Sequence, residues 1–255
     1  MRSFELKLAW AKHQSDVLQA EIAAWRESGG YGVVFEKHSQ RPGHIIRLKV
    51  GDIAPGIPLI IGDALYGLRS ALDHLAYNLA EAFTDPLPPD AGERSEFPIY
   101  GNKPLPKDLA ERKLGAMDPH ARAIIEGLQP HTRGDSYAKD PLWKLNELAR
   151  LDRHRFMHLT VAAFAGIGLG GDNLHIEEME FGGAGPTAGD GAELGYASIR
   201  PIDPGRPMQM NLTPEPQVVL KDGTWAGSPV LELLAEIRGH IEAEVVTRLT
   251  PFLKS

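Results

Sequence analysis

The chain has 255 residues, of which 42% are hydrophobic and 24% are charged, and its formal net charge is -7. These values are typical of globular proteins, whereas nucleic-acid-binding proteins are more often basic. The sequence has no cysteine, which excludes disulfides, thiolate nucleophiles and cysteine-ligated metal sites. No apolar run reaches the roughly 20 residues of a membrane span, and the N-terminus lacks the apolar core of a signal peptide. We therefore expect a cytoplasmic protein that does not contact a membrane.

Apolar residues at helical spacing predict a helix over residues 1–28, and Gly29 and Gly30 end it. Two runs rich in β-branched and aromatic residues follow within 31–50 and are joined by a short loop that contains Pro42 and Gly43. These runs predict a β-hairpin inserted after the first helix.

Residues 58–83 are predicted to form the most regular helix of the chain. Its apolar side chains alternate by fours and threes, the spacing of a bundle seam: Ile61, Leu65, Leu68, Leu72, Leu75 and Leu79. On another side of this helix, Tyr66, Arg69 and Asp73 follow one another at three- and four-residue steps. Side chains at this spacing are neighbours on a helix, so we expect them to interact.

Between the second and third long helices the sequence predicts a loop, a short apolar anchor at Phe97 and two short helices. Asp118 precedes Pro119, and Asp140 precedes Pro141. An aspartate at the N-cap followed by a proline in the first turn is typical of a helix start. The second of these pairs therefore predicts where the third long helix begins.

Residues 140–165 are predicted to form this third long helix. Its apolar side chains fall on one face: Leu145, Leu148, Phe156, Leu159 and Ala163. Asp152 falls in the middle of the same face, and an unpaired buried carboxylate costs several kcal/mol. We therefore expect Asp152 to pair with Arg155, one turn further along, or with Arg69 on the facing helix.

After Gly166, glycine-rich turns separate short strand-like runs within residues 173–221. A final helix is predicted over residues 228–253, where apolar residues recur at three- and four-residue steps. Together these elements predict a single α+β domain over residues 1–255. It would consist of an antiparallel bundle of about four long helices with an inserted β-hairpin and a small antiparallel sheet.

The segment from Arg69 to His74 combines an arginine, four further residues and a histidine within a predicted helix. It resembles the R-x4-6-H motif of the HEPN superfamily, many members of which are metal-independent ribonucleases that act as dimers. The resemblance implies a ribonuclease or an RNA-binding toxin-type protein, with RNA as the partner, a homodimer and no cofactor. The chemistry is reasonable, because a histidine can move the proton of a 2′-hydroxyl and an arginine can hold the scissile phosphate.

Two longer segments resemble a set of bacterial and phage hypothetical proteins that pair an LRxALDHLxxxL helix with an LxxLxxxDKHR helix. The segments are Leu68–Tyr77 and Leu145–Arg155, with Phe97–Ile99 between them, and Arg153 stands where lysine is usual. No activity comes with that family. The resemblance therefore supports the fold and the choice of site residues.

The candidate catalytic residues lie on two predicted helices: Arg69, Asp73, His74, Asp152, His154 and Arg155. In a ribonuclease, Asp73 would orient Arg69 or His74, and the patch from Arg153 to Arg155 would hold phosphate. A solvent-reachable pocket at Arg69 and His74 would distinguish such a site from a buried structural network.

Two alternatives to a ribonuclease stay open. The first is a non-catalytic helical scaffold or binding protein, in which the Asp152 network only fixes the packing of the core. The second is a bundle hydrolase that binds a metal through His74, His154 and His158. The last two histidines stand at i and i+4 and share one helix face, and a facing helix would supply the third ligand.

Overall fold

A computed structural model describes residues 1–155, 157–162, 167–182, 185, 187–214 and 216–254. The chain divides into two compact units. The helical unit comprises Met1–Leu18, Leu59–Phe156 and Leu231–Ser255, and the β unit comprises Gln19–Pro58 and Met157–Val230. Helices occur together with antiparallel sheets, which confirms the predicted α+β class.

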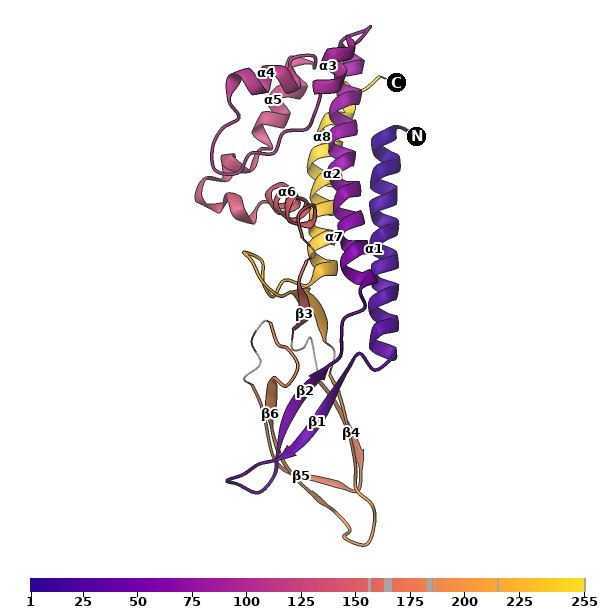
Figure 1. Cartoon of the computed structure of the whole chain (residues 1–255), viewed down its shortest axis with the longest axis vertical. Helices are drawn as coiled ribbons and strands as arrows, with labels where there is room; N and C mark the ends of the chain where they lie inside the picture. Colours follow the sequence, from indigo (N-terminus) through magenta and orange to yellow (C-terminus); the bar gives the residue numbers. More distant parts are fainter. Residues whose placement is uncertain (156, 163–166, 183–184, 186, 215, 255) are drawn as a thin grey trace. The chain divides into compact units, whose positions relative to one another are not determined.

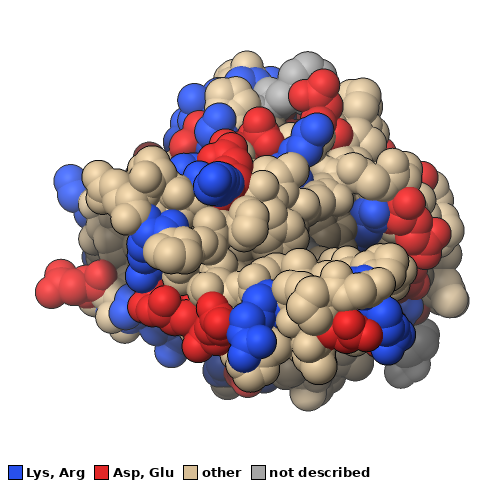
Figure 2. Space-filling model, turned by 90° about the horizontal axis from the view of Figure 1, so that it is seen from below, with Lys and Arg blue, Asp and Glu red and all other residues tan. Residues whose placement is uncertain are grey.

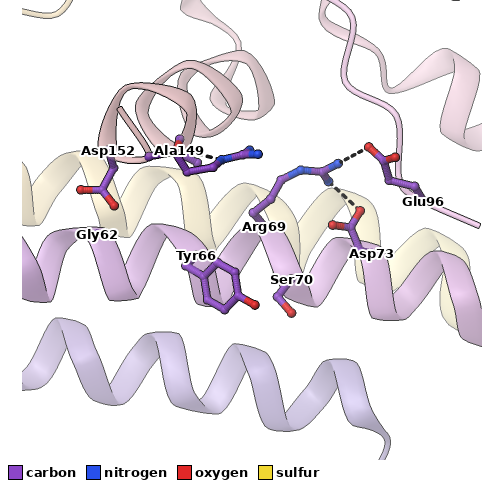
Figure 3. Close-up of a pocket in the computed structure, with 9 residues that line it drawn as sticks. Gly62, Tyr66, Arg69, Ser70, Asp73, Glu96, Ala149 and Asp152 are labelled. Carbon is purple, nitrogen blue, oxygen red and sulfur yellow. Dashed lines mark hydrogen bonds and ion pairs between the residues drawn. The ribbon is translucent and has the colours of Figure 1, made fainter. Parts of the chain in front are cut away.

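The helical segments of the chain follow one another in this order: α1 (Ser3–Glu27), α2 (Gly56–Phe83), α3 (Pro89–Arg94), α4 (Lys107–Leu114), α5 (Pro119–Gly127), the 3-10 helix η1 (Pro130–Lys139), α6 (Pro141–Asp152), α7 (Val230–His240), the π-helix η2 (Ile241–Val246), α8 (Thr247–Leu249) and the 3-10 helix η3 (Thr250–Phe252). In the helical unit, α2 runs alongside the first part of α1 and alongside α7 and α8 (Figures 1 and 3). None of the helices in the described part of the chain combines the length and the apolar character that a membrane crossing needs.

The core of the helical unit follows the predicted stripes. All six apolar residues of the 58–83 pattern are buried on α2, and Leu72 and Leu75 are fully enclosed. The opposing stripes of α1 and α7 bury Phe4 and Ile237 in the same way. Gly67 marks a close approach between α2 and α1, because a Cβ atom added there would lie 3.1 Å from the Cβ atom of Ala11.

The two predicted N-caps are confirmed. The Asp118 carboxylate accepts hydrogen bonds from the backbone N–H groups of His120 and Ala121 at the start of α5. The buried Asp140 carboxylate accepts one from the N–H of Leu142 at the start of α6, at 2.9 Å. Each cap satisfies a helix donor that has no partner within the helix.

The third predicted long helix is shorter than the sequence analysis expected. Helix α6 ends at Asp152, and residues 159–162 form strand β3 (Leu159–Ala162) instead of further helical turns. Leu159, Thr160 and Val161 pair with strand β8, which lies far away in the sequence, and buried β-branched residues favour such pairing. Phe156 and residues 163–165 of the predicted helix lie outside the described residues.

The predicted bundle of four long helices is therefore not confirmed. Helix α6 has only 12 residues, whereas α2 has 28. In Figures 1 and 3, α6 is seen nearly end-on where α2 is seen from the side, so α6 crosses α2 instead of running along it. This crossing places the C-terminal end of α6 over the first half of α2.

The β unit contains strands with these bounds: β1 (Tyr31–Lys37), β2 (His44–Val50), β3 (Leu159–Ala162), β4 (Ile167–Asp172), β5 (Leu174–Phe181), β6 (Glu193–Pro201), β7 (Gln209–Pro214) and β8 (Gln217–Leu220). Among the described residues they form a four-stranded sheet in the order β1-β2-β6-β5 and two separate pairs, β3-β8 and β4-β7. The predicted hairpin is confirmed, because β1 and β2 pair antiparallel from Tyr31 opposite Val50 to Lys37 opposite His44.

Candidate functional site

The polar sides of α2 and α6 enclose a pocket of about 460 Å³ in the helical unit (Figure 3). The residues that line it are Gly62, Tyr66, Arg69, Ser70, Asp73, Glu96, Ala149, Asp152 and Arg153. Four of them, Gly62, Tyr66, Arg69 and Asp73, repeat at the 4-3-4 spacing that places side chains on one face of a helix. The volume lies within the range of small-molecule sites.

One wall of the pocket is an ion-pair network around Arg69, whose side chain is only 12% exposed. Its Nη1 atom lies 3.0 Å from Oδ1 of Asp73, which is an ion pair without a hydrogen bond. Its Nη2 atom lies 3.1 Å from Oε1 of Glu96 and donates to the carbonyl oxygen of Phe97 at 2.8 Å. Glu96 also pairs with Lys113 at 2.8 Å.

This network fastens the segment after α3 to α2. The Asp73 carboxylate accepts a hydrogen bond from the backbone N–H of Phe97 at 3.1 Å, and the Phe97 side chain is fully buried. Burial raises the pKa of the Asp73 carboxyl above its ordinary value, and the Arg69 guanidinium opposes this shift. The network contains two cations and two carboxylates, so its charges compensate one another. The interaction predicted between Arg69 and Asp73 is confirmed.

The opposite wall contains a carboxylate that has no partner among the described residues. Asp152 is half-buried at the end of α6, and none of the described residues forms a salt bridge or hydrogen bond with its carboxylate. Burial raises the pKa of the Asp152 carboxyl, and the nearby negative charge of Asp63 adds to the effect. The last turn of a helix is also the negative end of its dipole, which disfavours an anion there.

The space that Asp152 occupies exists because residue 62 is a glycine. A Cβ atom added at Gly62 would lie 2.5 Å from Oδ2 and 2.7 Å from Oδ1 of Asp152. Figure 3 shows the Asp152 side chain pointing from α6 to α2 at this glycine. A glycine inside a helix costs about 1 kcal/mol relative to alanine. Gly62 and Asp152 are therefore both unfavourable for stability, and together they place an anion in the pocket.

The predicted ion pair of Asp152 is wrong for two physical reasons. The helix ends at Asp152, so Arg155 does not follow it on the same face, and its side chain is exposed to solvent. Arg69, the other expected partner, is already held by Asp73 and Glu96. The sequence pattern correctly placed an acid on an inward-facing side of α6 but could not show that other carboxylates surround the nearest arginine.

Arg153 is the second charged side chain of the pocket for which the described part of the chain offers no charged partner. Its Nε atom donates to the carbonyl oxygen of Ala149 at 3.3 Å, which holds the side chain against α6. Among the described residues, no hydrogen bond or ion pair engages its terminal nitrogens. Asp152 and Arg153 are consecutive and line the same pocket, yet none of the ion pairs of the described residues joins them.

The histidines of the sequence analysis lie elsewhere. His74 is half-buried on α2 but does not line the pocket, because five residues along an ideal helix correspond to a rotation of about 140° from Arg69. His154 is exposed beyond the end of α6 and also does not line the pocket. His158 precedes β3 and pairs with Asp222 through Nδ1 at 2.9 Å.

The metal alternative is not supported by this geometry. His154 and His158 do not share a helix face, because α6 ends before either of them. Within the described ranges, no group of three or more histidines and carboxylates is arranged as metal ligands.

Five pocket residues were not among the candidates predicted from the sequence, namely Gly62, Tyr66, Ser70, Glu96 and Ala149. Gly62 carried a usable signal, since a glycine within a leucine-rich helix often marks the close approach of another group. Glu96 carried none, because it belongs to a loop whose docking on α2 depends on contacts distant in sequence. Comparison of the chain with protein-family models, curated proteins and solved structures finds no match.

Proposed function

We propose that the helical unit is a ligand-binding module and that the pocket between α2 and α6 accepts a small charged molecule. The observation that carries the proposal is the carboxylate of Asp152, which lines the pocket, lacks a partner in the described chain and occupies space that only a glycine at position 62 provides. Residues that reduce stability at a pocket are typical of binding sites, where function offsets the cost.

The contrast with Arg69 supports this proposal. The network of Arg69, Asp73, Glu96 and Lys113 compensates its own charges and forms a fixed wall. If the role of Asp152 were purely structural, cations or hydrogen-bond donors of the chain would surround its carboxylate as well. Asp152 instead faces a cavity with room for a ligand, so a bound ligand would supply the group that pairs with its carboxylate.

The test is retention of small molecules from a bacterial metabolite extract, measured by ultrafiltration and mass spectrometry. We compare the wild-type chain with Gly62→Ala, which displaces the Asp152 carboxylate, and with Gly239→Ala on α7. A Cβ atom at Gly239 meets nothing within 4 Å, so this variant is the matched control. We expect the wild type and the control to retain the same molecules and Gly62→Ala to lose them. Identical retention by all three proteins would overturn the proposal.

Metal-independent RNA cleavage by a HEPN-like dimer is a second candidate function. It is favoured by the position of Arg69 in a solvent-reachable pocket beside Asp152, a carboxylate with a raised pKa that suits proton transfer. Two features weigh against it. His74 lies outside the pocket, and on the face shown in Figure 2 acidic and basic side chains are interspersed without a continuous basic patch.

The RNA candidate predicts that the purified chain degrades single-stranded RNA in the presence of a chelator and sediments as a dimer. Asp152→Asn would then abolish cleavage, and His74→Ala would leave it intact because His74 does not reach the pocket. RNA that stays intact with the wild-type chain removes this candidate and leaves the ligand-binding proposal unaffected.

A further inference from the structure

We infer that the ligand of this pocket is a small zwitterion, with a cationic nitrogen that pairs with Asp152 and an anionic group that pairs with Arg153. The inference rests on the proposed binding function and names the class of ligand. It follows from the charges that remain after the internal ion pairs of the pocket have been assigned.

The charges of the network around Arg69 cancel one another, so two charged side chains of the described lining are left to pair with a ligand. Arg69 and Lys113 balance Asp73 and Glu96 within one connected network. The remaining charged side chains that line the pocket are Asp152 and Arg153. They are opposite in sign and not paired with each other, so a ligand that complements both must carry both signs of charge.

Asp152 forms the cation-binding end. Its carboxylate rests on the backbone of α2 at Gly62, so it can turn only a limited part of its surface to a ligand. The negative charge of Asp63 reinforces the potential there. A protonated amine is the complementary group, because it neutralises the carboxylate and supplies the hydrogen bonds that the described chain does not.

Arg153 forms the anion-binding end. Its Nε atom is held by the carbonyl oxygen of Ala149, which leaves the terminal nitrogens to face a ligand. A guanidinium presents donors in a planar fork that matches a carboxylate or a phosphate. Arg69 is not assigned this role, because its guanidinium already forms ion pairs with Asp73 and Glu96 and donates to the carbonyl oxygen of Phe97.

The test measures the affinity of the 255-residue chain for probes matched in length, by isothermal titration calorimetry. The probes are γ-aminobutyrate, butylamine and butyrate, which carry both charges, the cation only and the anion only. β-Alanine and ε-aminocaproate vary the separation of the two charges, and phosphoethanolamine replaces the carboxylate with a phosphate. We expect the best-fitting zwitterion to bind at least about tenfold more tightly than butylamine or butyrate.

Two variants test which side chain binds which charged end of the ligand. Asp152→Asn is expected to weaken binding of the zwitterion and butylamine but not of butyrate. Arg153→Gln should weaken binding of the zwitterion and butyrate but not of butylamine. Arg155→Gln is the matched control, because Arg155 is also an exposed arginine after α6 but does not line the pocket, and it should leave all affinities unchanged.

The outcomes separate this inference from the proposed function. The zwitterion assignment is overturned if a singly charged probe binds as tightly as every zwitterion, or if Asp152→Asn and Arg153→Gln leave zwitterion binding unchanged. If no probe binds but Gly62→Ala still abolishes retention from the metabolite extract, the ligand belongs to another class and the binding function stands. If both experiments are negative, both proposals fall.

Discussion

The contact between Gly62 and Asp152 makes a quantitative prediction about stability. Replacing a glycine by alanine inside a helix stabilises a protein by about 1 kcal/mol. At Gly62 the new Cβ atom would lie 2.5 Å from Oδ2 of Asp152, a separation at which the carboxylate must move. We therefore expect Gly62→Ala to stabilise the wild-type chain by clearly less than about 1 kcal/mol.

The interaction is isolated by a double-mutant cycle. In an Asp152→Ala background the obstacle is gone, so Gly62→Ala should yield the full gain of about 1 kcal/mol. The difference between the two backgrounds, the coupling energy, is expected to be at least about 0.5 kcal/mol. Gly239→Ala is the control, because open space surrounds its Cβ position and its effect should be the same in both backgrounds.

The assay is urea denaturation followed by circular dichroism, with the free energies of unfolding taken at one pH near neutrality. A coupling energy below about 0.3 kcal/mol, within the range of independent sites, would show that the two residues do not interact. It would mean that the Asp152 carboxylate does not occupy the space above Gly62, and the pocket would then lack its central feature.

Three further predictions follow from the charges of the helical unit. Because burial raises the pKa of Asp152, its charged form opposes folding, and Asp152→Asn should stabilise the chain at neutral pH by about 1 kcal/mol or less. Measured by urea denaturation, this gain in stability should disappear as the pH falls through the pKa of Asp152 in the folded chain to the ordinary aspartate value of about 4. If Asp152→Asn instead lowers the stability near neutral pH, the prediction is wrong. Arg69→Met strands the carboxylates of Asp73 and Glu96 and should cost about 1–3 kcal/mol in the same assay, whereas an effect below about 0.5 kcal/mol would show that the network is not structural. Burial lowers the pKa of His240, so the unfolded chain binds a proton at this residue more readily than the folded chain does. The free energy of unfolding should therefore fall as the pH drops below the ordinary histidine pKa of 6.5. His240→Gln should make this fall less steep, and an unchanged pH dependence would assign it to other groups.

The helices of the chain were predictable where the pattern of burial is local. The stripe that includes Leu65 and Leu72 on α2 repeats at the helical period, and burial on one side follows from that repeat alone. The hairpin of β1 and β2 was equally predictable, because its two strands are close in sequence. The end of α6 was not, since Val161 becomes a strand residue only through pairing with Val218 on β8.

The candidate site was predictable in part for the same reason. Arg69 and Asp73 are neighbours on one helix, so their contact follows from spacing. Glu96 competes for the same guanidinium from a loop, and no pattern in the sequence indicates that contact. The partner assigned to Asp152 was wrong because the competition for Arg69 is decided by tertiary structure. The sequence identified the residue that needs a partner but not where the partner comes from.

The pKa of Asp152 in the ligand-free chain, measured by carbon-13 NMR of its side-chain carboxyl, shows directly whether a cation lies beside this carboxylate. Because this carboxylate is half-buried and lacks a partner within the described chain, we predict a pKa above the ordinary aspartate value. Addition of a zwitterion that binds should lower this pKa, because a cationic partner favours the charged form. A pKa well below the ordinary value in the free chain would show that Asp152 already has a cation beside it, and would contradict the claim.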